Sequence, residues 1–400
     1  MKITLFTFYY PPDLSAGSFR AVALINALSR KINHKDELHV ITTHPNRYAS
    51  FEVSANDKEK FNNITIHRIK IPSHHSGMIS QSYAFFRYAI SAFSICKKIK
   101  PNFLIGTTGR LMTGILTGIT ANRLGCKYFI DLRDIFSEAI SDIFSQKNIL
   151  IGSILKVVFF NLEKKLVIHS AGVNVVSEAF PEYFQLKGIN TSHWTFFPNG
   201  VDKEFINLKV KKNINHNEVK TILYAGNIGS GQGLDIVLPE IAKEIGNDYV
   251  FIVIGDGGKK NNLVERIRKN NIRNIKVVAP VSRSVLIDYY KKSDFLFLHL
   301  NCFPAFRRVL PSKIFEYGAI GKPIIAGLSG YSAKFMKDHL PYASIFEPGD
   351  FQAASDSILE ISELIDDNII NDFIQNFSRE ILMNQMAEHI LKTIHSVKPN

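Results

Sequence analysis

The sequence predicts an α/β protein with two Rossmann-like domains. Apolar stretches of strand length alternate with amphipathic stretches of helical length from one end of the chain to the other. Such alternation is typical of parallel sheets joined by right-handed helical crossovers. The series occurs twice, and residues 197–202, which contain Pro198 and the turn-forming pair Asn199-Gly200, separate the two copies.

Six strands are expected in each half of the chain. In the first half they cover Ile3–Phe8, His39–Thr43, Ile64–Ile71, Phe103–Gly106, Lys127–Ile130 and Gly172–Val176. In the second half they cover Thr221–Ala225, Tyr249–Ile254, Ile275–Val278, Phe295–His299, Pro323–Ile325 and Ala343–Phe346. Helical patterns such as Arg20–Lys31 and Leu234–Glu244 lie between them, and the last ~40 residues also follow a helical pattern. Because parallel sheets bind ligands at the carboxyl ends of their strands, two facing domains would enclose a cleft lined by these loops.

Length and composition fit an ordinary globular protein. The chain has 400 residues, of which 46% are hydrophobic and 21% charged. Its three cysteines, Cys96, Cys126 and Cys302, are far apart and indicate a reducing compartment. The first residues are expected to form a core strand rather than a secretory signal, and no apolar run reaches the ~18 residues of a membrane span. No motif indicates a metal site or a hydrolytic nucleophile, so neither is expected.

Positive charge is concentrated in the first half of the chain. The net charge is +12; residues 1–200 contain 23 Lys+Arg against 13 Asp+Glu, and residues 201–400 contain 25 against 23. A basic face usually meets an anionic membrane or a nucleic acid, although a Lys-rich proteome gives the same excess. Ser82–Lys100 and Ile149–Lys165 are apolar and end in lysines. They favour the membrane, although each alone fits a core helix with a basic end.

Two glycine-rich stretches follow expected strands in the second half. The first, Tyr224–Asp235, leads into a helix and contains Gly226, Asn227, Gly229 and Gln232. Small residues let backbone N–H groups approach phosphate oxygens, although a tight turn without a ligand needs glycine too. The second stretch, Gly255–Lys260, is a plainer turn. The loop that contains Ala279 and Val281 could present backbone groups to a nucleotide base.

The strongest signal is the segment Arg307–Gly327. It brings together three cations, a hydroxyl and a carboxylate, which are Arg307, Arg308, Lys313, Ser312 and Glu316. Cations at the start of a helix favour a phosphate, and a carboxylate one turn later could accept hydrogen bonds from a ribose diol. The segment therefore predicts a site for a nucleotide diphosphate, the alternative being a helix with a solvated basic end.

Polar residues also follow two strands of the first half. The loop Tyr10–Arg20 contains Gly17, and Asp131, Arg133 and Asp134 follow the strand that ends at Ile130. Both loops are expected to project into the cleft. An arginine between two carboxylates could equally be a structural ion pair.

These motifs resemble the retaining glycosyltransferases of the GT-B fold, glycosyltransferase family 4. The resemblance spans nearly the whole chain and is strongest in Tyr224–Asp235, Gly255–Gly257 and Phe306–Gly327, with Asn199–Asp202 matching the interdomain linker. Within the family the chain is most similar to transferases that build bacterial capsule and O-antigen repeat units. The resemblance implies an acceptor-side domain over 1–198, a nucleotide-sugar domain over 199–374, and a C-terminal helix, about 375–400, that crosses back to the first domain.

The resemblance also implies the substrates. The donor would be a UDP-sugar and the acceptor a polyprenyl-diphosphate-linked saccharide, handled without metal or cofactor at the cytoplasmic face of the membrane, with no nucleic-acid partner. Donor contacts would come from Gly17, Gly226, Asn227, Gly229, Gln232, Ala279, Val281, Arg307, Ser312 and Glu316. Catalytic contacts would come from Asp131, Arg133, Asp134, Arg308 and Lys313.

Three positions depart from the usual family pattern. Arg308 stands where many members have the first glutamate of Glu-x7-Glu, Asn227 and Gln232 replace the Arg and Lys of the phosphate loop, and Arg133 replaces a histidine. N-acetylfucosamine transferases look alike in these places, which indicates an N-acetylated 6-deoxyhexose donor. The missing glutamate leaves open a non-catalytic nucleotide-sugar or lipid-binding member of the fold. A UDP-sugar epimerase is a further alternative.

Overall fold

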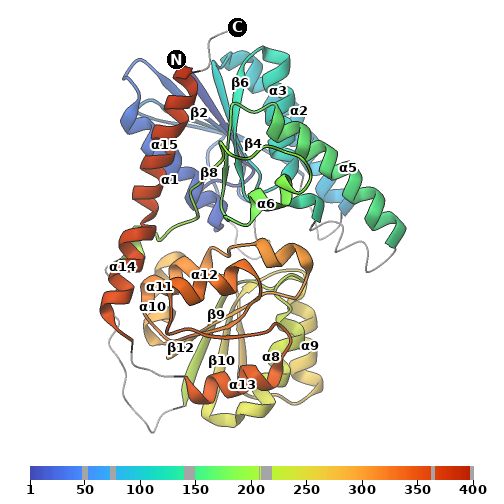
Figure 1. Ribbon diagram of the computed structural model, residues 1–400, viewed down its shortest axis with the longest axis vertical. Helices are drawn as coiled ribbons and strands as arrows, with labels where there is room; N and C mark the ends of the chain where they lie inside the picture. Colours follow the sequence, from blue (N-terminus) through green and yellow to red (C-terminus); the bar gives the residue numbers. More distant parts are fainter. Residues whose placement is uncertain are drawn as a thin grey trace. The chain divides into compact units, whose positions relative to one another are not determined.

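The computed structural model of the chain describes residues 1–46, 53–72, 78–138, 149–206, 208, 219–361 and 365–396. It divides into two compact domains (Figure 1). The first contains the described residues up to Asn199 together with those from Arg379 onward. The second contains Gly200–Ser378.

The first domain is built on a sheet with the strand order β3-β4-β2-β1-β5-β6-β7-β8. The strands are β1 (Lys2–Phe6), β2 (Glu37–Thr43), β3 (Lys58–Phe61), β4 (Ile64–Ile69), β5 (Phe103–Thr107), β6 (Lys127–Leu132), β7 (Gly172–Val175) and β8 (Thr195–Phe196). All neighbours are parallel except β3 and β4. In the centre, Leu5 lies opposite Val40 on one side and Ile105 on the other.

Helices cover both faces of this sheet because its strands alternate apolar side chains to two cores. The helices are α1 (Ala16–Lys31), α2 (Met78–Ile99), α3 (Leu111–Leu124), α5 (Ile149–Ile168), α6 (Phe180–Gln185) and α15 (Arg379–Ser396). Phe6 and Ile130 belong to the core under α2, α3 and α5, whereas Leu5 and Phe129 belong to the core under α1 and α15.

The last helix packs on the first domain, as expected. Met383 and Met386 of α15 are fully buried in the core that it shares with α1, and the Lys31 ammonium lies 2.7 Å from the Glu388 carboxylate. The helix begins at Arg379 rather than near residue 375. The residues before it form α14 (Asp367–Phe377) in the second domain, because Phe373 and Phe377 pack against Phe315 there.

The second domain is a parallel sheet with the order β11-β10-β9-β12-β13-β14. The strands are β9 (Lys220–Asn227), β10 (Tyr249–Asp256), β11 (Ile275–Val278), β12 (Phe295–His299), β13 (Ile324–Gly327) and β14 (Ser344–Phe346). The helices are α7 (Lys203–Ile206), α8 (Leu234–Ile245), α9 (Lys260–Lys269), α10 (Arg283–Lys292), α11 (Lys313–Ile320), α12 (Tyr331–His339), α13 (Phe351–Glu360) and α14, with short 3-10 helices η1 (Gly246–Asp248) and η2 (Pro304–Arg308).

All twelve expected strands are present, and their ends differ from the expected ones by at most two residues. Two short strands were missed. Strand β3 is charged at three of its four positions and lies at the sheet edge, so it has no apolar alternation to signal it. Strand β8 has only two residues.

The topology fixes where ligands should bind in each domain. In the second domain successive connections run outward from β9 in one direction and from β12 in the other, so the strand order reverses between these neighbours. In the first domain the reversal falls between β1 and β5. Ligands of such sheets bind at the carboxyl ends of the strands where the order reverses.

Candidate functional site

The loop after β9 forms a closed backbone turn at the reversal point of the second domain. The side-chain amide of Asn227 donates to the amide oxygen of Gln232 at 2.9 Å, and the same oxygen accepts from the backbone N–H of Gly229 at 3.3 Å. The two residues that replace the family's phosphate-loop cations therefore satisfy each other. The N–H groups of Ile228, Gln232 and Gly233 also donate within the protein, so the loop can offer a ligand the backbone N–H groups of Ser230 and Gly231. It has no cation of its own.

Residues at the end of β12 hold this loop in place. The backbone N–H of Asn301 donates to the Gly231 carbonyl at 2.8 Å, and its side-chain amide donates to the Ser230 carbonyl. His299 contacts the Gln232 carbonyl through Nδ1 at 2.7 Å. Burial lowers the pKa of His299 to about 4, so the ring is neutral at physiological pH and donates from Nδ1. The loops after β9 and β12 thus form one unit.

The side chain of Lys313 extends over the start of the glycine-rich loop. A side chain on Gly226 would collide with Cε and Nζ of Lys313, so glycine leaves the space that this ammonium occupies. The Nζ atom also lies 5.6 Å from the ring centre of Tyr224. Burial lowers the pKa of the ammonium, and Glu316 acts in the opposite direction. Among the described residues no carboxylate forms an ion pair with Lys313, so its charge is available to an anion.

Glu316 is held one turn later on α11. The Tyr290 hydroxyl, at the end of α10, donates to its carboxylate at 3.0 Å. The carboxylate is half-buried, which leaves part of it open to solvent. Ser312 occupies the position before the helix and its hydroxyl makes no capping hydrogen bond. Lys313, Glu316 and Ser312 therefore share the first turn of α11 beside the loop after β9.

The structure separates the cations that the sequence groups together. Arg307 and Arg308 end the 3-10 helix η2, and Val309 and three further residues precede α11, which Lys313 begins. The helix η2 is beside the glycine-rich loop, since the Phe306 ring would lie 2.9 Å from a Cβ on Gly231. Arg307 is exposed and Arg308 half-buried. Lys313, rather than either arginine, is the cation directly over the loop.

The loop expected to hold a base follows the edge strand β11. Ala279 is exposed and Val281 half-buried. Strand β10 separates β11 from β9, so this loop lies farther along the same sheet edge than the loops of β9 and β12.

In the first domain Asp131 is part of a closed structural cluster. Its carboxylate accepts from Nε and Nη2 of Arg20 at 2.7 and 2.8 Å and from the Asn174 amide at 2.8 Å. The Arg20 and Asp131 side chains are 2% and 4% exposed. Arg20 also donates to the carbonyls of Phe197 and Pro198. Asp131 therefore fixes the end of the domain, and its oxygens are occupied.

Arg133 occupies the reversal point of the first domain. A Cβ on Gly17, in the loop after β1, would collide with its Nη1, and a Cβ on Gly109, after β5, would lie 3.5 Å from the same atom. The Thr108 hydroxyl accepts its backbone N–H at 2.9 Å, and its Nη2 lies 3.4 Å from the Asn199 amide oxygen. The structure thus brings Arg133 to Gly17, whereas Asp134 is exposed.

Sequence reasoning missed the residues that support these sites. His299, Asn301 and Tyr290 act through hydrogen bonds to partners 26 to 71 residues away, and no local motif signals such pairs. Asn174 is a polar residue in an otherwise apolar strand. A polar residue in such a strand could have indicated a buried polar contact. Among the described residues no group of His, Cys, Asp or Glu could hold a metal ion.

Residues 206–377 match the family Glycosyl transferases group 1. This match covers nearly all of the second domain, Gly200–Ser378. WcaI of Escherichia coli K12, named as a colanic acid biosynthesis glycosyl transferase, is 27% identical over 169 residues, which cover 40% of this chain and 41% of WcaI. The aligned segment thus spans about two fifths of that relative.

Solved glycosyltransferase structures share the complete fold. Sucrose-phosphate synthase from Thermosynechococcus elongatus superposes with a TM-score of 0.76 over 99% of this chain and 100% of its own, at 13% identity. HepE of Anabaena, in complex with UDP and glucose, does so with a TM-score of 0.65 over 99% and 100%, at 16% identity. These likenesses establish the two-domain architecture of GT-B glycosyltransferases.

Proposed function

We propose that the chain is a retaining, metal-independent glycosyltransferase that uses a UDP-sugar in the assembly of a bacterial surface polysaccharide. The observation that carries the proposal is the Lys313 ammonium, held over Gly226 at the reversal point of the domain that matches the group 1 glycosyltransferases. UDP is the nucleotide bound to the structural neighbour HepE, and the name of WcaI supports a role in polysaccharide assembly.

The geometry suits a diphosphate better than a single phosphate. The backbone N–H groups of the loop after β9 can bind one phosphoryl group, while Lys313 and the first turn of α11 bind the other. Glu316, steadied by Tyr290, would accept hydrogen bonds from the ribose hydroxyls. Arg307 and Arg308 supply further positive charge from η2, and Ala279 and Val281 supply backbone groups for the base.

In the proposed reaction the sugar C1–O bond to UDP breaks and a new C1–O bond to the acceptor hydroxyl forms on the same face. The acceptor proton passes to the leaving β-phosphate oxygen, so no protein nucleophile is required. Charge that develops on this oxygen is stabilised by Lys313 and the loop N–H groups, which are in place before the reaction. Arg133 beside Gly17 is the cation at the reversal point of the first domain, and it would contact an anionic or hydroxyl group of a substrate. Asp131 would make no such contact, because its carboxylate is hydrogen-bonded to Arg20.

For the acceptor we propose a saccharide on a polyprenyl diphosphate, and for the transferred sugar N-acetyl-L-fucosamine. The support for the lipid is a surface on α2, α3 and α5, in which α3 packs between the other two (Figure 1). We call it the apolar face. Its exposed side chains are Tyr83, Phe86, Ile90, Met112, Ile119, Ile154, Val157 and Val158.

Basic residues lie on the same helices as the apolar face. Lys97 and Lys98 end α2, and Lys164 and Lys165 lie near the end of α5, all of them exposed. Exposed apolar side chains with flanking lysines suit an anionic lipid surface. No described helix is long and apolar enough to cross a bilayer. We therefore propose peripheral attachment to the inner face of the cell membrane.

Vesicle flotation tests the attachment. Wild-type protein should float with vesicles that contain anionic lipid and less with neutral vesicles, and Phe86→Ser combined with Ile154→Ser should stay at the bottom. Leu186→Ser, which changes a side chain that is 76% exposed on the same domain, is the matched control. Equal flotation of all three proteins would remove the apolar face from the account.

A second candidate is a nucleotide-sugar-binding protein without transferase activity. The Asn227–Gln232 pair favours this second candidate, because the two amides replace two cations of the usual phosphate loop and hydrogen-bond to each other. A panel of UDP-sugars separates the two functions. A transferase releases UDP from its own donor, slowly by hydrolysis and faster when a lipid-linked saccharide is added. The second candidate binds donors and releases none.

A further inference from the structure

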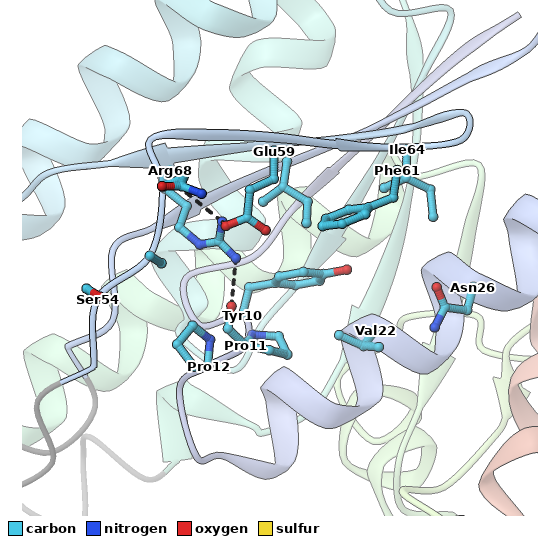
Figure 2. Close-up of a pocket in the computed structure, with 13 residues that line it drawn as sticks. Tyr10, Pro11, Pro12, Val22, Asn26, Ser54, Glu59, Phe61, Ile64 and Arg68 are labelled. Carbon is cyan, nitrogen blue, oxygen red and sulfur yellow. Dashed lines mark hydrogen bonds and ion pairs between the residues drawn. The ribbon is translucent and has the colours of Figure 1, made fainter.

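The first domain contains a pocket of about 640 Å³ that none of the assignments above uses (Figure 2). It lies between the loop after β1, helix α1 and the hairpin β3–β4. The described residues that line it lie between Tyr10 and Arg68 and belong to the first domain.

One wall of the pocket is apolar and aromatic. The Phe61 side chain is 58% exposed, and Tyr10 is buried apart from the part that faces the pocket. Val22 of α1 and Ile64 of β4 add aliphatic surface. In Figure 2 the Tyr10 ring is drawn between the Phe61 ring above and Val22 below, with Asn26 to the right. An exposed phenylalanine at the mouth of a pocket is a surface on which a ring can stack.

Polar groups surround this wall. Asn26 and Asn56 are exposed amides that line the pocket. The Tyr10 hydroxyl points away from Arg68 toward the space beside Asn26 (Figure 2). Burial raises the pKa of Tyr10 to about 12, so this hydroxyl keeps its proton and can donate.

Two charged side chains that line the pocket, Arg68 and Glu59, form an ion pair. Nη1 of Arg68 donates to the Glu59 carboxylate at 2.6 Å, and Nη2 donates to the Pro11 carbonyl at 2.7 Å. The Arg68 side chain is only 3% exposed. Nη1 and Nη2 of the guanidinium therefore bind the wall and its charge is paired, whereas its buried Nε has no hydrogen-bond partner among the described residues. The half-buried Glu59 carboxylate remains as an acceptor at the surface.

We propose that this pocket binds one sugar residue of the acceptor saccharide. A pyranose has an apolar face for Phe61 and a rim of hydroxyls for Asn26, Asn56, Glu59 and the Tyr10 hydroxyl. A hydrocarbon chain would leave those polar groups without hydrogen bonds, which is unfavourable. A phosphate would find the one buried cation already neutralised. The neutral polyol is the ligand class that satisfies both the ring and the rim.

The chain connects the pocket to the site at Arg133. Pro12 lines the pocket, and Gly17, which contacts Arg133, follows five residues later, so the two places are at most about 18 Å apart. A short oligosaccharide can bridge that span. The assignment of the ligand as an acceptor rests on the proposed transferase function, whereas the binding of a sugar residue does not.

The test uses the full chain and ligand-observed NMR with the methyl glycosides of glucose, galactose, fucose and N-acetylglucosamine. At least one glycoside should receive saturation from the wild-type protein. Phe61→Ala and Asn26→Ala should weaken its binding about tenfold, the size of a stacking or hydrogen-bonding contact. Leu186→Ala, an exposed position on the same domain outside the pocket, should leave it unchanged.

Three results would overturn the assignment: no glycoside binds, the glycoside binds Phe61→Ala and wild type equally, or hexanol or inorganic phosphate binds the pocket in its place. Calorimetric titration with UDP runs in parallel on each variant. Intact UDP binding with no glycoside binding rejects the pocket and leaves the transferase. Glycoside binding that depends on Phe61 without UDP binding keeps the pocket and rejects the transferase.

Discussion

Replacing Lys313 by alanine tests the proposed donor site most sharply among single substitutions. The ammonium is half-buried, lies over Gly226 and forms no ion pair with the described carboxylates. Two unit charges about 4 Å apart attract by about 4 kcal/mol at an effective dielectric constant of about 20. Solvent at this half-buried site reduces the value to roughly 3 kcal/mol, which corresponds to about a 10²-fold loss of kcat/KM.

The assay measures UDP release from the donor in the presence of acceptor, with calorimetric titration of UDP alongside. Lys337→Ala is the matched control, since it removes an exposed lysine from α12 of the same domain and should leave both readouts unchanged. If Lys313→Ala keeps the wild-type kcat/KM and the wild-type UDP affinity, the Lys313 ammonium does not bind the donor diphosphate.

Gly226→Ala tests the same contact from the other side. The new methyl group would displace the end of the flexible Lys313 side chain. It would also strain the backbone, because the φ of Gly226 is 156°, a value that L residues rarely adopt, so the melting temperature of the variant is measured beside its activity. We expect a loss of kcat/KM similar to that of Lys313→Ala. Because both changes disrupt one contact, the double variant should lose little more than either single variant. Additive losses would show that Gly226 acts independently of Lys313.

Four further outcomes are expected. Glu316→Ala should weaken UDP binding by roughly tenfold in calorimetry, because a charged acceptor is lost; unchanged affinity would exclude a ribose contact. Dialysis against EDTA should leave UDP binding and turnover unchanged, and lost turnover that Mg²⁺ restores would contradict the metal-independent mechanism. Asp131→Asn should lower the free energy of unfolding by roughly 3 kcal/mol or more in urea, because Arg20 remains as a buried charge without its partner; a stable but inactive variant would instead make Asp131 catalytic. Burial raises the pKa of Glu163 to about 7, so the folded protein favours its protonated form. The free energy of unfolding should therefore fall by about 3 kcal/mol as the pH rises from 4.5 to 7. Glu163→Gln should lack this pH dependence.

The strands were predictable because a strand that is buried on both faces has a recognisable apolar run in its own sequence. Each parallel strand between two helical layers needs a continuous apolar run, and the turns after the runs contain glycine, proline or asparagine. The edge strand β3 has no such run, since its residues Lys58, Glu59 and Lys60 meet solvent. Strand β3 is defined by its antiparallel pairing with β4, and its own residues do not signal that pairing.

The site was predictable in part. Gly226 and Lys313 could be recognised because the glycine-rich loop and the cation each carry a local pattern. Their contact joins positions far apart in the chain, and no periodicity encodes it. Arg307 and Arg308 are close to Lys313 in sequence, but the structure places them on η2 and Lys313 on α11.

Asp131 illustrates the limit of reasoning from type and position. A carboxylate after a strand beside an arginine fits a catalytic acid and an ion pair equally well. Its partner is Arg20, 111 residues away, rather than the neighbouring Arg133. Likewise, the replacement of loop cations by Asn227 and Gln232 gains its meaning only from the hydrogen bond that joins the two amides.

The most direct measurement is a crystal structure of the full chain soaked with UDP. The account predicts the two phosphoryl groups between the N–H groups of the loop after β9 and the Lys313 ammonium, with a ribose hydroxyl on Glu316. A nucleotide bound elsewhere, or a diphosphate that leaves Lys313 without a phosphate contact, would contradict it.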